Sequence, residues 1–224
     1  MSIDPAFALR VLPPLVRGAA LTVEVSIWAI GLATGVGICG AAARGSRIRP
    51  VRWLASAYVE LFRNTPLLVQ IFFIFFGLPR VGVRLSAFQS GLLALVLYTG
   101  AYNTEVFRAG LEAVPRGLRE AAMALGLSRW QQFRFVELPL AARIALPALG
   151  NNFVALVKNS SLVSTIGMVE LTFVARDLEA WTFRSFEVYG MATLVYLGLV
   201  LALSGALRRV EARALRFLRP PEAR

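Results

Sequence analysis

Two pairs of opposite charges recur at the same spacing within apolar sequence. Glu60 and Arg63 are three residues apart, and so are Glu105 and Arg108. On a helix this spacing places both members on one face, where they can form an ion pair. Ionisable groups inside a bilayer need such a partner or a water-filled path. We interpret the first pair as a structural ion pair or part of a polar path, and the second as an anchor for the segment that follows it.

A second group of polar residues surrounds Lys158. Gly150-Asn151-Asn152 precedes it, and Asn159-Ser160-Ser161 follows it. A broken helix at this place would turn backbone N–H groups inward and offer a seat for a carboxylate. Lys158 is then either a counter-charge for a substrate or a base that pairs with Glu60 or Glu105. Pro66 predicts a kink in an earlier helix, with Thr65 in reach of the freed backbone groups.

Several kinds of chemistry are excluded by composition. The chain has no His, which excludes His-ligated metals and a Ser-His-Asp triad. Its single cysteine, Cys39, excludes an internal disulfide and Cys-rich metal sites. No Gly-rich loop precedes the lone lysine, so there is no Walker A motif for ATP. We therefore expect no catalytic residue, no metal and no cofactor in this chain.

The elements that position these residues are long apolar stretches. The chain is 57% hydrophobic and 17% charged, whereas soluble domains average about 25% charged residues. A membrane span needs about 20 mostly apolar residues. The sequence predicts an all-α integral membrane protein with about five spans, at residues 19–43, 54–78, 86–107, 145–168 and 188–207. The Gly31-x-x-x-Gly35 spacing in the first of them is interpreted as ordinary helix packing.

The distribution of arginines predicts the orientation of these spans. The chain carries 24 Lys and Arg against 13 Asp and Glu, a net charge of +11. Successive loops are alternately rich and poor in arginine, and cytoplasmic loops are the basic ones. This places the N-terminus outside, with residues 1–17 as a periplasmic segment that lacks signal-peptide features, and residues 210–224 as a basic cytoplasmic tail. The charge is thus explained by topology, without nucleic-acid binding.

The longest polar segment, residues 108–143, contains a short amphipathic helix. Pro115 and Gly117 break the preceding helix, and Gly126 is a predicted stop. Leu118, Ala122 and Leu125 fall on one face of a helix over about 118–127, with Glu120 in its first turn. Such a helix either docks into a groove of a partner protein or rests on the lipid surface. The physical pattern alone leaves both interpretations open.

Within this segment the residues follow a specific pattern. Glu120-Ala121-Ala122, then Gly126, then Leu138-Pro139 resemble the EAA motif of ABC-transporter permeases, EAA-x3-G-x9-I-x-LP, with Val136 in place of the isoleucine. Further blocks are similar to the polar amino-acid uptake subfamily, of the histidine, glutamine, glutamate and arginine type. These blocks are residues 59–70, 105–110, 147–151 and 158–164.

The resemblance implies a type I ABC importer (MetI-like) permease domain over residues 18–209, in a bacterial inner membrane. Two permease subunits, identical or paralogous, would pair, each on a cytoplasmic ATPase that binds ATP and magnesium. A periplasmic binding protein would deliver the amino acid. Segment 108–143 would contain the coupling helix that contacts the ATPase. Asn159 stands where some members have Asp, which favours a neutral or acidic substrate over a cationic one.

Two sets of residues follow from these arguments. The predicted ATPase-coupling residues are Glu120, Ala121, Ala122, Gly126, Leu138 and Pro139. The predicted substrate-path residues are Glu60, Thr65, Gln70, Asn103, Lys158, Asn159, Ser160 and Ser161. The alternative is an ion-coupled secondary transporter that acts without an ATPase, but it would need a coupling-ion site and commonly has inverted repeats, and neither is visible. A membrane enzyme lacks candidate residues.

Overall fold

The computed structural model describes residues 5–216, and every regular element in that range is helical. The elements are α1 (Pro5–Arg44), α2 (Arg49–Arg63), α3 (Leu67–Phe72), η1 (Phe73–Gly77), η2 (Leu78–Val81), α4 (Ala87–Glu112), α5 (Arg116–Ala124), α6 (Arg129–Gln132), η3 (Phe133–Glu137), α7 (Leu138–Asn159), η4 (Ser160–Ile166), α8 (Leu171–Thr182) and α9 (Ser185–Arg216). The all-α prediction is confirmed for these residues. Parts of the predicted terminal segments, residues 1–4 and 217–224, lie outside them.

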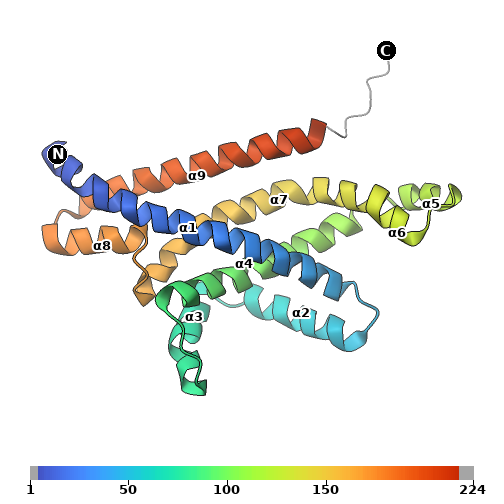
Figure 1. The fold of residues 1–224 in the computed structure, drawn as a ribbon, viewed down its shortest axis with the longest axis horizontal. Helices are drawn as coiled ribbons and strands as arrows, with labels where there is room; N and C mark the ends of the chain where they lie inside the picture. The colour runs from blue at the N-terminus through green and yellow to red at the C-terminus, as the bar shows by residue number, and fades with distance from the viewer. Residues whose placement is uncertain (1–4, 217–224) are drawn as a thin grey trace, which may run out of the picture.

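The four long helices α1, α4, α7 and α9 run along the long axis of the molecule (Figure 1). The start of α1 and helix α8 lie at one end of this bundle. The loop between α1 and α2, helices α5 and α6, and the last turns of α9 lie toward the other end. The arginine-rich segments therefore gather at the same end as the predicted coupling helix, as the charge pattern requires. Which end faces the cytoplasm remains a prediction.

Helix α4 packs closely against α1 because glycines on α1 leave room for it. A Cβ atom at Gly37 would lie 2.6 Å from the Cβ of Asn103, too close for two carbon atoms. Gly31 and Gly35, the glycines of the predicted packing motif, would meet no atom within 4 Å. Close helix contact through glycine therefore occurs on α1, but at positions other than the motif that the sequence analysis singled out.

The predicted span 54–78 is two helices rather than one. The axes of Arg49–Arg63 and Leu67–Val81 differ by 108°, and Pro66 adopts an extended backbone conformation between them. Proline lacks an N–H donor and disfavours helical conformation in the residue before it. The expected kink is therefore a full break, and α3 projects sideways from the bundle (Figure 1).

Among residues 5–216, three helices are suited by length and composition to cross a membrane: Pro5–Arg44, Arg129–Ile166 and Ser185–Ala214. The broken pair α2–α3 would make a fourth. Helix α4, predicted as the span 86–107, does not join them because its inner face carries the buried polar residues Ser90, Thr99, Asn103 and Thr104. A helix surrounded by protein needs no continuous apolar surface. The number of spans and the outside position of the N-terminus remain predictions.

Candidate functional site: the coupling helix and the polar lane

Helix α5 is held between two strong breaks. Pro115 is its N-cap residue, and Gly126 lies just beyond its end at φ +75°. The N–H groups of Gly126 and Leu127 donate to the carbonyls of Met123 and Ala122, at 2.9 and 3.1 Å. This pair of bonds is a Schellman motif, which requires the left-handed conformation that glycine adopts without strain. The predicted stop at Gly126 is confirmed, whereas the helix begins at Arg116, so Glu120 lies beyond its first turn.

One face of α5 is turned away from the rest of the chain. Ala122 is buried, while Glu120, Ala121 and Gly126 are exposed. The large apolar side chains of Leu118, Met123 and Leu125 are exposed as well, Leu125 to 80%. A nine-residue helix with an uncovered apolar face is too short to be stable alone. It fits a helix that is completed by contact with something outside this chain.

Arg119 ties α5 to two other helices. Its Nη2 donates to the carbonyl oxygen of Leu111, near the end of α4, at 2.7 Å. Its Nε lies 3.4 Å from Oε1 of Glu137, directly before α7. The two ends of the predicted motif, α5 and Leu138-Pro139, are thereby joined through residues that the motif itself does not specify. Leu138 and Pro139 form the first turn of α7, with Leu138 exposed.

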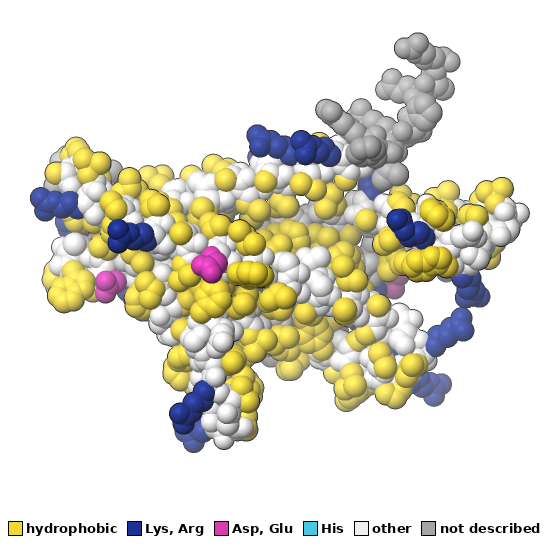
Figure 2. Space-filling view, viewed as in Figure 1, with side chains coloured by type: hydrophobic (Ala, Val, Ile, Leu, Met, Phe, Trp, Pro, Cys, Tyr) yellow, Lys and Arg dark blue, Asp and Glu magenta, His cyan; other side chains and the backbone are white. Residues whose placement is uncertain are grey.

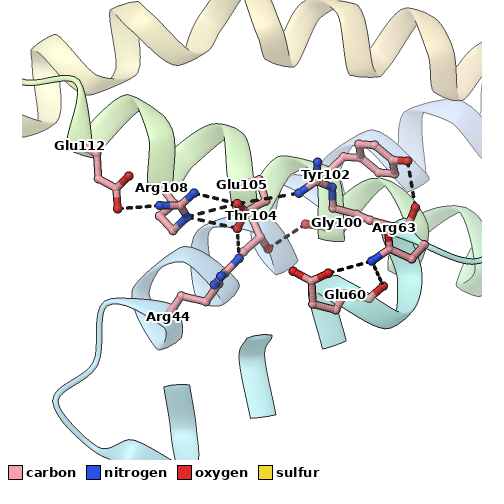
Figure 3. Close-up of polar contacts among 10 residues, drawn as sticks. Arg44, Glu60, Arg63, Gly100, Tyr102, Thr104, Glu105, Arg108 and Glu112 are labelled. Carbon is pink, nitrogen blue, oxygen red and sulfur yellow. Dashed lines mark hydrogen bonds and ion pairs between the residues drawn. The ribbon is translucent and has the colours of Figure 1, made fainter. Parts of the chain in front are cut away.

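Glu105 is the centre of an ion network at the same end of the bundle (Figure 3). It pairs with Arg108 at 2.9 Å, as the i, i+3 spacing predicts, and also with Arg44 at the end of α1. Arg63, at the end of α2, lies 3.8 Å from it. Arg108 in turn contacts Glu112 at 2.6 Å. One half-buried carboxylate thus joins α1, α2 and α4 immediately before the segment that leads to α5.

Two predicted pairings are wrong: Glu60 with Arg63, and Lys158 with Glu60 or Glu105. Arg63 turns toward Glu105, and Glu60 instead accepts a hydrogen bond of 2.8 Å from the Asn64 amide. Lys158 does not pair with Glu60 or Glu105. Its side chain is exposed, and among the described residues no carboxylate lies within ion-pair distance of it. A role of Lys158 toward substrate remains a prediction.

A polar lane follows the contact between α4 and α7. The Asn152 side-chain amide donates to Oδ1 of the buried Asn103 at 3.0 Å, and Nδ2 of Asn103 has no hydrogen-bond partner. A cavity of about 120 Å³ beside this bond is lined by Tyr98, Thr99, Tyr102, Asn152, Ala155 and Asn159. A larger one of about 440 Å³ continues from Tyr102 and Asn152 to Arg63 and Glu105. The smaller cavity carries amides and hydroxyls, the larger one is lined mostly by small and apolar residues such as Val106, Ala109 and Ile144, and the lane ends at the ion network.

Other predicted path residues have structural roles in this chain. Gln70 donates to the Phe62 carbonyl at 3.0 Å and to the Thr65 hydroxyl at 2.8 Å, which satisfies groups freed by the break at Pro66. Ser160 and Ser161 donate back to carbonyls three residues earlier. The helix continues from α7 into η4 without a gap, so the expected broken helix and its inward N–H groups are absent in this described region. Asn103 and Asn159 alone among the predicted path residues border or contact the lane.

A buried carboxylate that the sequence analysis missed lies at the opposite end of the bundle. Glu170 is fully buried and caps α8 through the N–H of Phe173, at 2.8 Å. The Tyr196 hydroxyl donates to it at 2.7 Å, and Thr22 lies 3.4 Å away. It thereby connects α1, α8 and α9. The sequence signal that could have found Glu170 is an N-cap residue directly before an apolar run. Glutamate is seldom an N-cap residue, so this signal is weak.

Comparison with known proteins settles the family. Residues 33–216 match the family described as the binding-protein-dependent transport system inner membrane component. The chain belongs to this family. It is similar to the glutamine transport system permease protein of Escherichia coli strain K12, with 36% identity over 95% of this chain and 98% of that protein. It is also similar to a probable glutamine ABC transporter permease protein of Bacillus subtilis, with 38% identity over 86% and 89% of the two chains.

A solved structure agrees with this permease throughout its length. The crystal structure of an amino acid ABC transporter with histidines contains a chain with a TM-score of 0.89 and 36% identity, covering 95% of this permease and all of that chain. The predicted type I importer permease fold is therefore confirmed. The region matched to the family includes α5, the polar lane and the network around Glu105, so all three belong to the permease domain itself.

Proposed function

We propose that this permease is the membrane subunit of an ATP-driven importer of polar amino acids. The proposal is supported by the names of its relatives and, in this chain, by one observation above all. An exposed apolar face on α5 is presented by a helix that is anchored at its base. Such a helix fits a groove on a partner protein. An ion-coupled transporter acts without an ATPase and would need no such docking helix. The relatives named above carry ABC-transporter or transport-system titles.

The partner on this face is a cytoplasmic ATPase, which would bind ATP and magnesium. Leu118 and Leu125, which are seven residues apart and share one face of α5, would enter its groove, and the exposed Glu120 on the other side would face a basic residue at the rim. Movement of α5 would be passed through Arg119 to the end of α4 and the start of α7. The same two helices border the polar lane, so ATP-dependent movement would reach the substrate path directly.

Neutral polar amino acids are the substrates that the lane favours. Tyr98, Thr99, Tyr102, Asn152 and Asn159 offer hydrogen bonds without a net charge. The charged groups at its end, Arg63 and Glu105, already have partners. A lane without net charge can accept the zwitterionic backbone of an amino acid, because its two charges cancel. The same lane offers no opposite charge to a charged side chain.

The lane in one chain is open, and a second permease subunit, identical or paralogous, would supply its other wall. Alternating access would then expose the lane first to a periplasmic binding protein and later to the cytoplasm. We propose on this basis that the permease is a multi-pass protein of a bacterial inner membrane, with the N-terminus outside and the C-terminus inside.

Uptake by cells that express variants of α5 tests the coupling role. Gly126→Asp forces a side chain into the left-handed backbone conformation that closes the helix, and we expect normal membrane levels with loss of amino-acid uptake. Gly82→Asp is the matched control, because Gly82 has φ +88° and equally open surroundings in the turn before α4. We also expect Glu120→Lys to abolish uptake. Normal uptake by both α5 variants at normal protein levels would refute the coupling role of α5.

A further inference from the structure

The second half of α9 forms a crevice with α7 that the transport function does not use. A cavity of about 220 Å³ lies between the two helices, lined by residues of α7 from Leu146 to Val154 and by Ser204, Leu207, Arg208 and Glu211 of α9. It is separate from the lane, which is bordered by α4 and the other side of α7. Gly150 faces Leu207 across it, where a Cβ would lie 3.7 Å from the leucine methyl.

The crevice lies where the apolar surface of α9 ends. Leu194, Leu197 and Leu201 are exposed along the helix, and only 6% of its apolar window is buried, so the rest of this chain leaves most of its apolar surface uncovered. The arginines then begin at Arg208. Figure 2 shows them as a basic patch over the end of α9. In a membrane-spanning helix, such a transition from apolar to arginine-rich sequence is expected at the depth of the phospholipid headgroups.

The polar lining of the crevice has two opposite charges and two neutral groups. Arg208 and Glu211 are three residues apart and thus lie on one face of α9, and no ion pair joins either of them to another described residue. The Asn151 amide and the Ser204 hydroxyl complete the polar part. Leu146, Pro147, Val154 and Leu207 form the apolar part. The lining therefore suits an amphipathic ligand that carries one negative and one positive charge.

We infer that this crevice binds a zwitterionic phospholipid of the phosphoethanolamine class. The Arg208 guanidinium would bind the phosphate through parallel hydrogen bonds, for which its planar fork is suited. The Glu211 carboxylate would accept hydrogen bonds from the ammonium group, which two carbons separate from the phosphate oxygen. Asn151 and Ser204 would contact the ester oxygens, and an acyl chain would lie along Leu207 and Val154. A purely anionic lipid would leave Glu211 facing a like charge.

Native mass spectrometry of the full chain, purified in detergent and delipidated, tests the inference with three probes. These are phosphatidylethanolamine, phosphatidylglycerol and free phosphoethanolamine. We expect the chain to retain phosphatidylethanolamine about tenfold better than phosphatidylglycerol, a ratio that corresponds to about 1.4 kcal/mol and is within the reach of one hydrogen bond to a charged group. Free phosphoethanolamine should not be retained. Retention of the free compound as strong as that of the lipid would overturn the lipid assignment, and equal retention of both lipids would overturn the headgroup assignment.

Four variants locate the site. Arg208→Gln should weaken both lipids about tenfold, and Glu211→Gln should remove the preference between them. Asn151→Ala, on the α7 wall, should weaken retention by a smaller factor. Arg209→Gln is the matched control, because Arg209 is the adjacent exposed arginine and does not line the cavity. Unchanged retention in Arg208→Gln and Asn151→Ala, or an equal loss in Arg209→Gln, would contradict binding in this crevice.

Discussion

Replacing Glu105 by glutamine removes the shared partner of three arginines without changing the size of the side chain. The Glu105 side chain is 17% exposed and contacts Arg44, Arg63 and Arg108. Glu112, seven residues later on the same helix, contacts Arg108 alone and is 66% exposed. The two carboxylates therefore form a matched pair, in which only the number of partners and the degree of burial differ.

The expected loss of stability is much larger for Glu105. Hydrogen bonds to charged groups contribute about 1.5–3 kcal/mol each when they are shielded, whereas exposed ion pairs contribute about 0.2–1 kcal/mol. Arg63 and Arg108 are more than a third exposed, so their contributions must be discounted. We expect Glu105→Gln to cost about 2–3 kcal/mol and Glu112→Gln at most about 0.5 kcal/mol.

Thermal unfolding of the purified variants in one detergent measures this difference. For a chain of this size, 1 kcal/mol shifts Tm by about 2–4 °C. Glu105→Gln should therefore lower Tm by about 4–12 °C, while Glu112→Gln should leave it nearly unchanged. High salt should weaken the effect of Glu112→Gln more than that of Glu105→Gln, since exposed pairs are screened. Equal small shifts in the two variants would show that the network around Glu105 does not join α1, α2 and α4.

Three further predictions concern other contacts. Arg119→Ala should speed hydrogen exchange of the α5 amides and reduce uptake, because it releases α5 from Leu111 and Glu137; exchange unchanged from wild type, with Arg116→Ala as control, would contradict this. Gly37→Val should lower stability by about 1–3 kcal/mol through overpacking against Asn103, whereas Gly31→Val, in open surroundings on the same helix, should be close to neutral in the same unfolding assay. Asn159→Asp should shift uptake toward arginine in competition with glutamine, because it adds a carboxylate to the lane; an unchanged ratio would argue against this lane as the substrate path.

The sequence predicted well those features that depend on local patterns. Pro115 and Gly126 bound α5 because each restricts the backbone at its own position. The i, i+3 pair Glu105–Arg108 forms because both residues lie on one helix. The spacing of the EAA motif identified the family before any contact was known, since it is a property of the chain alone.

Contacts between distant segments could not be predicted in the same way. Glu60 and Arg63 have the same spacing as Glu105 and Arg108, yet Arg63 turns to Glu105 because α2 and α4 pack together. Gln70 was assigned to the path because it is polar and lies in an apolar segment, but the break at Pro66 leaves carbonyls that it must satisfy. Helix α4 did not match a membrane span in hydropathy because its neighbours, rather than lipid, surround its polar face.

Protection of α5 by an ATPase tests the central claim most directly. Cys39→Ser removes the only cysteine, and Leu125→Cys or Val81→Cys then adds one at a site of similar exposure, 80% for Leu125 and 76% for Val81. The rate of maleimide labelling is measured in membranes with and without the co-expressed ATPase subunit. The account predicts that the ATPase slows labelling of the Leu125→Cys variant and leaves the Val81→Cys variant unaffected. Equal labelling of the Leu125→Cys variant with and without the ATPase would contradict it.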